Sequence, residues 1–293
     1  RYLVRSRGLG DVYKRQLSVQ FEVLIPDDPY AEKQWALNQT QIQKLWQGSR
    51  GSGIVVAVLD TGIDPNHEDL VGKVVIEVNL TNSPTSGDVY GHGTHVAGII
   101  AACSNNGVGI AGVAPESWLM NVKVAGDDGG CWAATVAMGI LWAVDKGADV
   151  INLSIELREP SPELEDAINY AWSQGVVIIA AAGNEGSQSP VYPAYYENCI
   201  AVAATRQDNT LAPLSNYGDW VDVTAPGVDI YSSLPGNSYG YKSGTSFATA
   251  YVSGLAALLL NVVTDTNGDG KLNDEVRAAI ENGCQQVNIN TID

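Results

Sequence analysis

Positive charge is scarce in this sequence. Its 293 residues contain 16 Lys and Arg against 33 Asp and Glu, which gives a formal net charge of −17 at pH 7. Nucleic acids and anionic membranes are bound through basic surfaces, so the composition argues against both as partners. The acidic excess instead suits solubility and calcium binding.

Cysteine is also sparse. Cys103, Cys131, Cys199 and Cys284 lie far apart and form no C-x-x-C pair, which argues against a zinc site. Cys199 belongs to the apolar run C-I-A-V-A-A, so we expect it to be a buried thiol. The even number of cysteines permits two disulfides in a secreted protein.

Internal repeats and low-complexity linkers are absent, and the length fits one large domain. Residues 1–16 carry five Lys or Arg and one Asp, and they resemble translated adapter sequence. We therefore expect them to be foreign to the natural protein, whose N-terminus would then be missing. We interpret residues 17–26 as a remnant of a pro-segment and residues 27–293 as one folded domain.

From Gly53 onward, apolar runs of strand length alternate with longer stretches that are compatible with helices. Near-continuous Val, Ile and Ala indicate strands buried on both faces, so we expect an α/β fold in which helices cover both sides of a mostly parallel sheet. The expected strands are 54–60, 118–124, 149–154, 176–181, 200–204 and 221–225, and the expected helices are 92–102, 132–146, 162–174 and 245–263. The last helix is apolar all round, but it follows a Gly-Thr-Ser turn and contains polar residues, which favours a core helix over a membrane span.

Three short segments place an Asp, a His and a Ser in that chain order. They are V-L-D-T-G-I-D around Asp60, G-H-G-T-H-V-A-G around His92 and S-G-T-S-F-A-T-A around Ser246. A serine nucleophile needs a base that takes its proton and a carboxylate that orients the base. Asp before His before Ser is one of the few chain orders in which unrelated folds have assembled these three residues. Asp60 and Ser154 also end predicted strands and Asn184 follows another, and the carboxyl ends of strands are where sites of α/β sheets gather.

Each residue alone has a structural explanation. Ser246 could cap the helix that follows it, Asp60 could belong to a turn, and Asn184 could be a turn residue between Gly183 and Glu185. Of the three histidines, His92 has Gly on both sides and precedes a helix, so it is the preferred base. We expect His95 to be a hydrogen-bonded structural residue and His67 to lie on a surface loop.

Together with A-A-G-N-E-G at 181–186, the three segments resemble subtilisin-like serine proteases, and the resemblance covers nearly all of residues 26–283. D-P-Y followed by Q-W, and Y-P-A-Y-Y at 192–196, are most similar to the thermitase branch. The resemblance implies the three-layer subtilisin-like fold. It also implies that Ser246 is the nucleophile, His92 the general base, Asp60 the orienting carboxylate, and Asn184 an oxyanion donor together with the Ser246 backbone N–H.

The implied function is a calcium-stabilised, secreted serine endopeptidase that acts on protein or peptide substrates and that we expect to be a monomer. The alternative is a catalytically silent domain of the same family that binds peptides or calcium. An esterase is disfavoured because the sequence has no G-x-S-x-G elbow and the chain order differs.

In the family, an extended substrate pairs with two backbone segments, which here correspond to Asp128, Gly129, Gly130 and to Ser154, Ile155, Glu156. Glu156 stands where the family has glycine, so its side chain could crowd the peptide or select nearby basic residues. Val191 corresponds to the base of the pocket for the cleavage residue. Because Val fills space that Gly would leave open, we expect a small or mid-sized apolar preference there.

The loop S-N-N-G-V-G-I at 104–110 resembles the family's calcium loop. The match implies side-chain oxygens from Asp28, Asp69 and Asn106 and carbonyl oxygens from a second set of residues: Ser104, Val108 and Ile110. A loop of this composition that binds nothing is the alternative.

A second calcium candidate does not depend on the family. D-T-N-G-D-G-K-L-N at 265–273 follows the EF-hand pattern, with Gly270 at position six. Position twelve is Val276, so the bidentate carboxylate is missing and we expect weak or incomplete binding. The loop could equally be a polar connection between helices. The candidate ligands are Asp265, Asn267, Asp269, Lys271 and Asn273.

Overall fold

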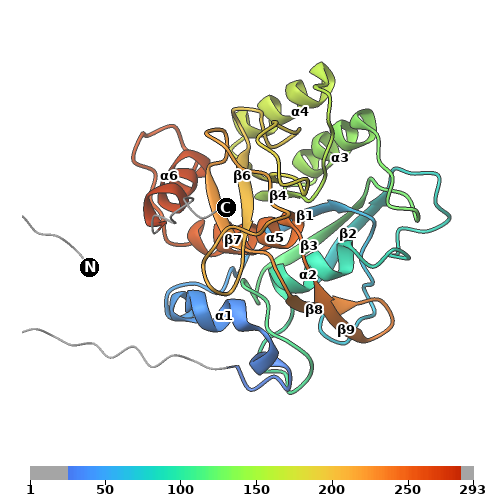
Figure 1. Ribbon diagram of the computed structural model, residues 1–293, viewed down its shortest axis with the longest axis vertical. Coiled ribbons are helices and arrows are strands. Elements are labelled where there is room, and N and C mark those ends of the chain that lie inside the picture. Colours follow the sequence, from blue (N-terminus) through green and yellow to red (C-terminus); the bar gives the residue numbers. More distant parts are fainter. Residues whose placement is uncertain (1–25, 285–293) are drawn as a thin grey trace, which may run out of the picture.

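Seven parallel strands form a sheet through the centre of the molecule (Figure 1). The structure is a computed structural model, and it describes residues 26–284. The predictions for 1–16 and for 17–25 concern residues outside this range. The strands run in the order β2-β3-β1-β4-β5-β6-β7. Their bounds are β1 Val55–Asp60, β2 Val74–Asn79, β3 Trp118–Lys123, β4 Val150–Leu153, β5 Val177–Ala181, β6 Ile200–Thr205 and β7 Val223–Pro226.

Helices cover both faces of the sheet, and Figure 1 shows α3 and α4 on one side with α2 and α5 on the other. Two apolar clusters correspond to these two interfaces. The three-layer α/β prediction is confirmed. The helices are η1 Ala31–Lys33, α1 Trp35–Thr40, η2 Ile42–Gln47, α2 Gly93–Ala101, α3 Ala133–Asp145, α4 Pro162–Ser173, α5 Thr245–Leu259 and α6 Asn273–Gly283.

Helix α4 illustrates how the sequence specifies a surface helix. The Ser161 side chain accepts a hydrogen bond from the Leu164 N–H, and Pro162 occupies the first turn, where its missing N–H costs nothing. Two acidic residues in that turn complement the helix dipole. Leu164, Ile168 and their neighbours at helical spacing are buried, so one face packs on the sheet and the other faces solvent.

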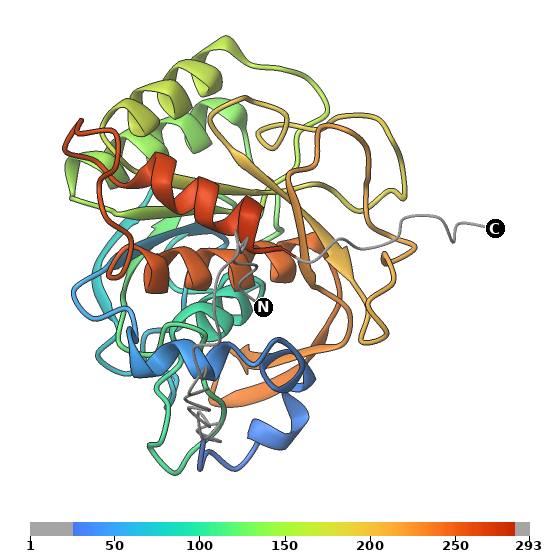
Figure 2. The same ribbon diagram turned by 90° about the vertical axis from the view of Figure 1, so that its left-hand side faces the viewer.

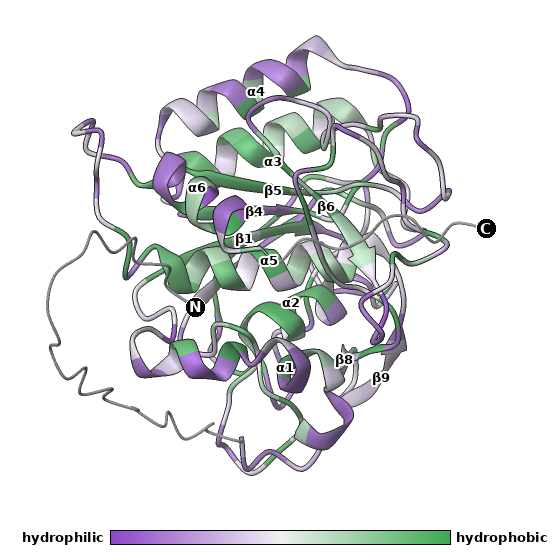
Figure 3. Cartoon of the chain, turned by 60° about the vertical axis from the view of Figure 1, so that its left-hand side comes forward, coloured by the Kyte–Doolittle hydropathy of each residue, from purple (hydrophilic) through white to green (hydrophobic). Residues whose placement is uncertain are grey.

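Helix α5 is buried on almost every side. Of its 15 residues, 13 are buried, which explains why it is apolar all round. It crosses beneath the sheet, and α6 lies alongside it (Figure 2). Figure 3 shows apolar colour dominating β1, β5 and α5, while α4 carries much polar colour. Within residues 26–284, no helix has the length and apolar character needed to cross a membrane.

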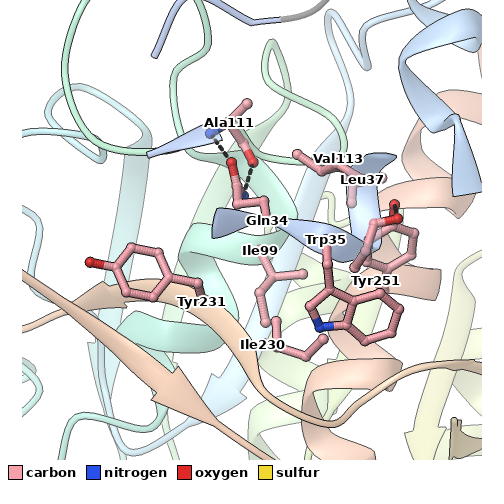
Figure 4. A pocket seen from close by; sticks show the side chains of 10 residues that line it. Gln34, Trp35, Leu37, Ile99, Ala111, Val113, Ile230, Tyr231 and Tyr251 are labelled. Atoms are coloured by element: carbon pink, nitrogen blue, oxygen red, sulfur yellow. Dashed lines mark hydrogen bonds between the residues drawn. The ribbon is translucent and has the colours of Figure 1, made fainter. Parts of the chain in front are cut away.

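The segment before β1 is fastened to the rest of the domain by polar side chains (Figure 4). Gln34 forms a reciprocal pair with the Ala111 backbone, donating to its O at 2.8 Å and accepting from its N at 2.9 Å. The Trp35 indole N–H donates to the Val228 carbonyl at 3.1 Å. The Tyr30 N–H donates to the Gly109 carbonyl at 2.8 Å, which brings the chain beside the loop at 104–110.

Several elements were not among the expected strands and helices: β2, the hairpin of β8 (Ile230–Leu234) and β9 (Ser238–Lys242), α1, α6 and the short helices η1 and η2. Strand β2 lies at the sheet edge, and its alternation of half-buried and exposed residues gives no continuous apolar run. The antiparallel hairpin of β8 and β9 stands apart from the main sheet and contacts α2. Hairpin strands of five residues carry too short a pattern for a prediction from periodicity.

Candidate active site

The predicted site residues gather where neighbouring strands end. Strand β1 lies between β3 and β4, and β5 follows β4. Asp60 is the last residue of β1, Gly129 and Gly130 follow β3, Ser154 follows β4, and Asn184 follows β5. Because the strands are parallel, these residues share the carboxyl edge of the sheet, which is the usual place for a site in this architecture.

Asp60 holds the imidazole of His92 with both carboxylate oxygens. His92 Nδ1 lies 2.8 Å from Oδ1 and 2.9 Å from Oδ2, and Asp60 is 2 % exposed. The approach requires glycine at position 93, since a Cβ there would lie 2.1 Å from the Gly62 carbonyl oxygen. An imidazole held this way through Nδ1 presents Nε2 for proton transfer.

Asp88 organises the turn that carries His92, and the sequence analysis did not single it out. Its carboxylate accepts from Thr61 Oγ1 at 2.8 Å, from the Gly91 N–H at 2.7 Å and from the Thr94 N–H at 2.8 Å. Asp88 is 7 % exposed. An Asp four residues before the His, within a Gly-rich turn, is the pattern that could have indicated this role.

Ser246 lies in the first turn of α5, where backbone N–H groups favour a developing negative charge. The N-cap of this helix is Gly244, without a side-chain capping bond, so a capping role for Ser246 is excluded. Ser154 Oγ donates to the Ser246 carbonyl at 3.1 Å, which links the end of β4 to the start of α5.

Asn184 is anchored to the same turn. Its Oδ1 accepts from the Thr245 N–H at 2.8 Å and from Thr245 Oγ1 at 3.2 Å. The residue is exposed, and among residues 26–284 its Nδ2 donates to no other group. The amide oxygen is therefore engaged, while the two amide protons are available beside the first turn of α5.

The three histidines have different environments. Burial lowers the pKa of His92, but the charge and hydrogen bonds of Asp60 outweigh it and leave the pKa raised. Burial lowers the pKa of His95 to about 3, so this histidine is neutral at physiological pH. Its Nε2 lies 3.2 Å from the Gly240 carbonyl, and the predicted structural role agrees with this geometry. Phe247 contacts both rings, at centroid distances of 5.4 Å from His92 and 4.6 Å from His95.

The prediction for His67 was wrong. This residue is fully buried, its Nε2 lies 3.0 Å from the Ser238 carbonyl, and its Nδ1 accepts from the Asp69 N–H at 3.2 Å. Its ring meets Tyr239 edge-on, at a centroid distance of 4.9 Å. Hairpin β8–β9 covers the loop of His67, and the sequence analysis had not anticipated this hairpin.

The predicted substrate segments lie at the same carboxyl edge of the sheet as Asp60. Ser154 and Glu156 are half-buried, Ile155 is buried, and the Leu157 N–H donates to the Tyr192 carbonyl at 2.7 Å. This pairing brings the segment after β4 beside Val191, which is 5 % exposed. On the other side, Gly129 has φ +82°, and a Cβ there would lie 3.0 Å from the Tyr90 ring.

Glu185 is a second carboxylate beside Glu156 that the sequence analysis did not assign. Both side chains accept from the Asn184 N–H, Glu156 at 3.3 Å and Glu185 at 3.1 Å. Burial and the neighbouring Glu185 raise the pKa of Glu156 to about 7. Glu185 follows the asparagine in A-A-G-N-E-G directly, and this adjacency was the available signal.

The loop at 104–110 surrounds two buried carboxylates. Asp28 accepts from the Asn106 N–H at 3.1 Å, and Asp69 accepts from Asn106 Nδ2 at 3.3 Å and from the Ile110 N–H at 2.9 Å. Burial raises the pKa of both carboxyl groups. Glycine is required at 109, where a Cβ would lie 1.8 Å from Asp69 Oδ2.

The loop at 265–273 folds around its own side-chain oxygens. Asp265 accepts from the Gly268 and Gly270 N–H groups at 2.6 and 2.9 Å, and Asp269 Oδ1 accepts from the Lys271 N–H. Asn267 Oδ1 likewise accepts from the Asp269 N–H. Asn273 differs from the other predicted ligands, because it is 2 % exposed and its Nδ2 donates to the Trp172 carbonyl outside the loop.

The four cysteines are free thiols. Cys199 is 1 % exposed, as predicted for the apolar run that contains it. Within residues 26–284, no group of three or more His, Cys, Asp or Glu side chains is placed to hold a metal ion. A cation bound at 104–110 would therefore need amide and carbonyl oxygens in addition to Asp28 and Asp69.

Comparisons with known proteins agree with this geometry. The subtilase family matches residues 51–293. The chain is 45 % identical to thermitase from Thermoactinomyces vulgaris over 267 residues, which cover 89 % of this chain and 92 % of thermitase. It is 46 % identical to subtilisin BL from Lederbergia lenta over 226 residues, which cover 77 % of this chain and 83 % of that protein.

A solved structure supports the same assignment. A protease from Pseudoalteromonas arctica superposes with a TM-score of 0.81 at 31 % identity, covering 90 % of this chain and 93 % of the other. The chain therefore belongs to the subtilase family, on its thermitase branch, and is a serine endopeptidase.

Proposed function

We propose that this protein hydrolyses peptide bonds through an Asp60–His92–Ser246 triad and an acyl-enzyme intermediate. The observation that carries the proposal is the pair of short contacts from Asp60 to His92 Nδ1, at the strand edge where α5 presents Ser246. Such contacts fix the tautomer that leaves Nε2 free to accept a proton.

In this mechanism Ser246 Oγ attacks the scissile carbonyl while His92 Nε2 takes its proton. His92 then gives that proton to the leaving amine, and Asp60 stabilises the imidazolium in between. Asn184 Nδ2 and the Ser246 N–H bind the oxyanion, which requires donors that are already in place before the reaction. The anchoring of Asn184 Oδ1 to Thr245 supports this role.

The substrate is an extended protein or peptide segment that pairs with the backbone at 128–130 and at 154–156. Val191, beside Tyr192, lies at the base of the pocket for the cleavage residue and favours a small or mid-sized apolar side chain. We further propose a secreted, monomeric enzyme that binds neither nucleic acid nor membranes. Its net charge of −17 supports the last point.

Calcium is the proposed stabilising ion. Two buried carboxylates, Asp28 and Asp69, meet at Asn106 and supply the hard oxygen donors that calcium prefers. The Asn106 side-chain oxygen, which accepts from the Val108 N–H at 3.1 Å, would turn to the ion as a third donor. Ser104, Val108 and Ile110 would complete the donor set with carbonyl oxygens. A bound cation would offset the cost of burying Asp28 and Asp69 together.

The 265–273 loop is a second, weaker calcium candidate. Glu275, at position eleven of the pattern, accepts from the Thr266 N–H at 2.9 Å and so turns back toward the loop. This carboxylate partly compensates for Val276 at position twelve.

The test of the proposed function is hydrolysis of casein and of an uncharged peptide anilide by the wild type, Ser246→Ala and Ser238→Ala. Ser238 is an exposed serine on β9, so its variant is the matched control. We expect Ser246→Ala to abolish hydrolysis and Ser238→Ala to retain it. A folded but inactive wild type would contradict the proposal and favour a silent peptide- or calcium-binding domain.

A further inference from the structure

Two carboxyl groups converge on a single backbone N–H next to the proposed oxyanion donor. The Asn184 N–H lies 3.3 Å from Glu156 Oε2 and 3.1 Å from Glu185 Oε2. Glu156 comes from the segment after β4 and Glu185 from the turn after β5. The two side chains thus meet from neighbouring strand ends at the residue that would bind the oxyanion.

Glycine at position 183 makes this approach feasible. Gly183 has φ +97°, and a Cβ there would lie 3.1 Å from Oε2 of both glutamates and 2.3 Å from Asn216 Nδ2. A side chain at 183 would therefore push the carboxyl groups apart. The left-handed backbone and the paired carboxyl groups belong to one local arrangement.

In the part of the chain that the structure describes, no cation is paired with the carboxyl group of Glu156 or Glu185. Arg158 is exposed and acts only through its more distant charge. The other group that faces the pair is Asn216, whose Nδ2 donates to Glu185 Oε2 at 3.0 Å. Two ionised carboxylates at such close range repel strongly, and one shared proton relieves the repulsion.

The surroundings place that proton on Glu156. Burial raises the pKa of Glu185, but hydrogen bonds with Glu156, Asn216 and the Asn184 N–H outweigh it and leave the pKa lowered. Burial, the hydrogen bond with Glu185 and the charge of Glu185 all raise the pKa of Glu156, to about 7. The pair therefore titrates as a unit within the pH range where proteases are assayed.

We propose that Glu156 and Glu185 are positioning residues that act through Asn184, holding its backbone firmly only while the two carboxyl groups share one proton. The proposal rests on the proposed function, because it assigns Asn184 to the oxyanion site. Thr245 fixes the side-chain oxygen of Asn184, and the carboxyl pair fixes its main chain. Both tethers are needed to aim Nδ2.

The sign of the effect follows from the raised pKa. Below about pH 7 the pair keeps its proton and the Asn184 turn is held; as pH rises through this value, both groups ionise and separate. The oxyanion contact forms in the transition state, so loosening it lowers kcat more than it raises KM. Complete loss of such a donor costs about 10²–10³ in kcat, so we expect a partial loss of about three- to ten-fold.

The experiment compares the wild type with Glu156→Gln, which keeps the shape and can donate permanently to Glu185 but cannot ionise. The substrate is an uncharged peptide anilide, and kcat and KM are measured from about pH 6 to about pH 9. The ratio of the variant's kcat to that of the wild type should be near one at the acidic end and rise to about three to ten at the alkaline end. Glu159→Gln, an exposed glutamate nearby, is the control, and its ratio should stay near one.

A second comparison separates action through Asn184 from a direct effect of charge on His92. In an Asn184→Ala background, Glu156→Gln should no longer change the pH profile. Independently of activity, the Asn184 amide resonance in the ¹⁵N spectrum should titrate near pH 7 in the wild type and not in Glu156→Gln. Any one of three results would overturn the proposal. They are a kcat ratio that does not change with pH, a pH-dependent ratio that persists in the Asn184→Ala background, and a wild-type Asn184 amide chemical shift that does not change with pH. Failure of the proposed function would instead show as absence of wild-type hydrolysis at every pH.

Discussion

Replacing Asp60 by Asn should cost about 10³–10⁴ in kcat/KM for a peptide anilide. The carboxylate lies against His92 Nδ1 through both oxygens and is 2 % exposed, so solvent screens it little. The form of His92 that accepts the serine proton is the neutral one, and the carboxylate stabilises this form little. In the transition state the imidazole becomes charged, and that is when the carboxylate stabilises it.

The magnitude follows from the geometry. Two unit charges ~4 Å apart at an effective dielectric constant of ~20 attract by about 4 kcal/mol, which corresponds to about 10³ in rate. The remaining loss comes from tautomers, because an amide N–H that faces Nδ1 favours the imidazole with its proton on Nε2. That tautomer cannot accept the proton of Ser246.

The assay is kcat/KM against pH, with active enzyme counted by a covalent inhibitor. Asp60 raises the pKa of His92, so in Asp60→Asn the rising limb of the profile should also move to lower pH. Asp145→Asn, an exposed aspartate at the end of α3, is the control and should behave as the wild type. A kcat/KM for Asp60→Asn within about ten-fold of the wild-type value would refute the reasoning.

Three further outcomes follow from the structure. Asn184→Ala should lower kcat by about 10²–10³ with little change in KM, measured with the same anilide; an unchanged kcat would remove Asn184 from the oxyanion site. Chelation of calcium should lower the melting temperature of Ser246→Ala, and adding Asp69→Asn should abolish that difference, since Asp69 lies at the centre of the proposed site. Leu164→Ala should reduce the free energy of unfolding, measured in urea, by about 2–5 kcal/mol. Leu164 is a fully buried residue of α4, so its truncation leaves a cavity; a smaller loss would mean that neighbouring side chains fill that cavity.

The sequence predicted the central strands well and the periphery poorly. Strands such as β1 and β5 are buried on both faces, so their apolar runs are continuous and unmistakable. Strand β2 has one exposed face at the sheet edge, and β8–β9 depends on packing against α2. The wrong prediction of a surface position for His67 has the same origin. The β8–β9 hairpin buries this residue, and the sequence around residue 67 carries no pattern that indicates burial.

The Asp60–His92 pair was predictable because the proposed chemistry restricts residue type, order and glycine spacing all at once. The residues that support it are less visible in a sequence. Asp88 acts through three hydrogen bonds that form only once the turn is folded, and Glu185 meets Glu156 only because β4 and β5 are neighbours. Contacts across strand ends depend on sheet order, which local periodicity does not encode.

The most direct test of the central claim is the site of covalent labelling by a fluorophosphonate probe. The account predicts one probe per chain, attached to Ser246 by peptide mapping, with labelling lost in Ser246→Ala and strongly slowed in Asp60→Asn. Labelling at another serine, or a folded wild type that takes up no probe, would contradict it.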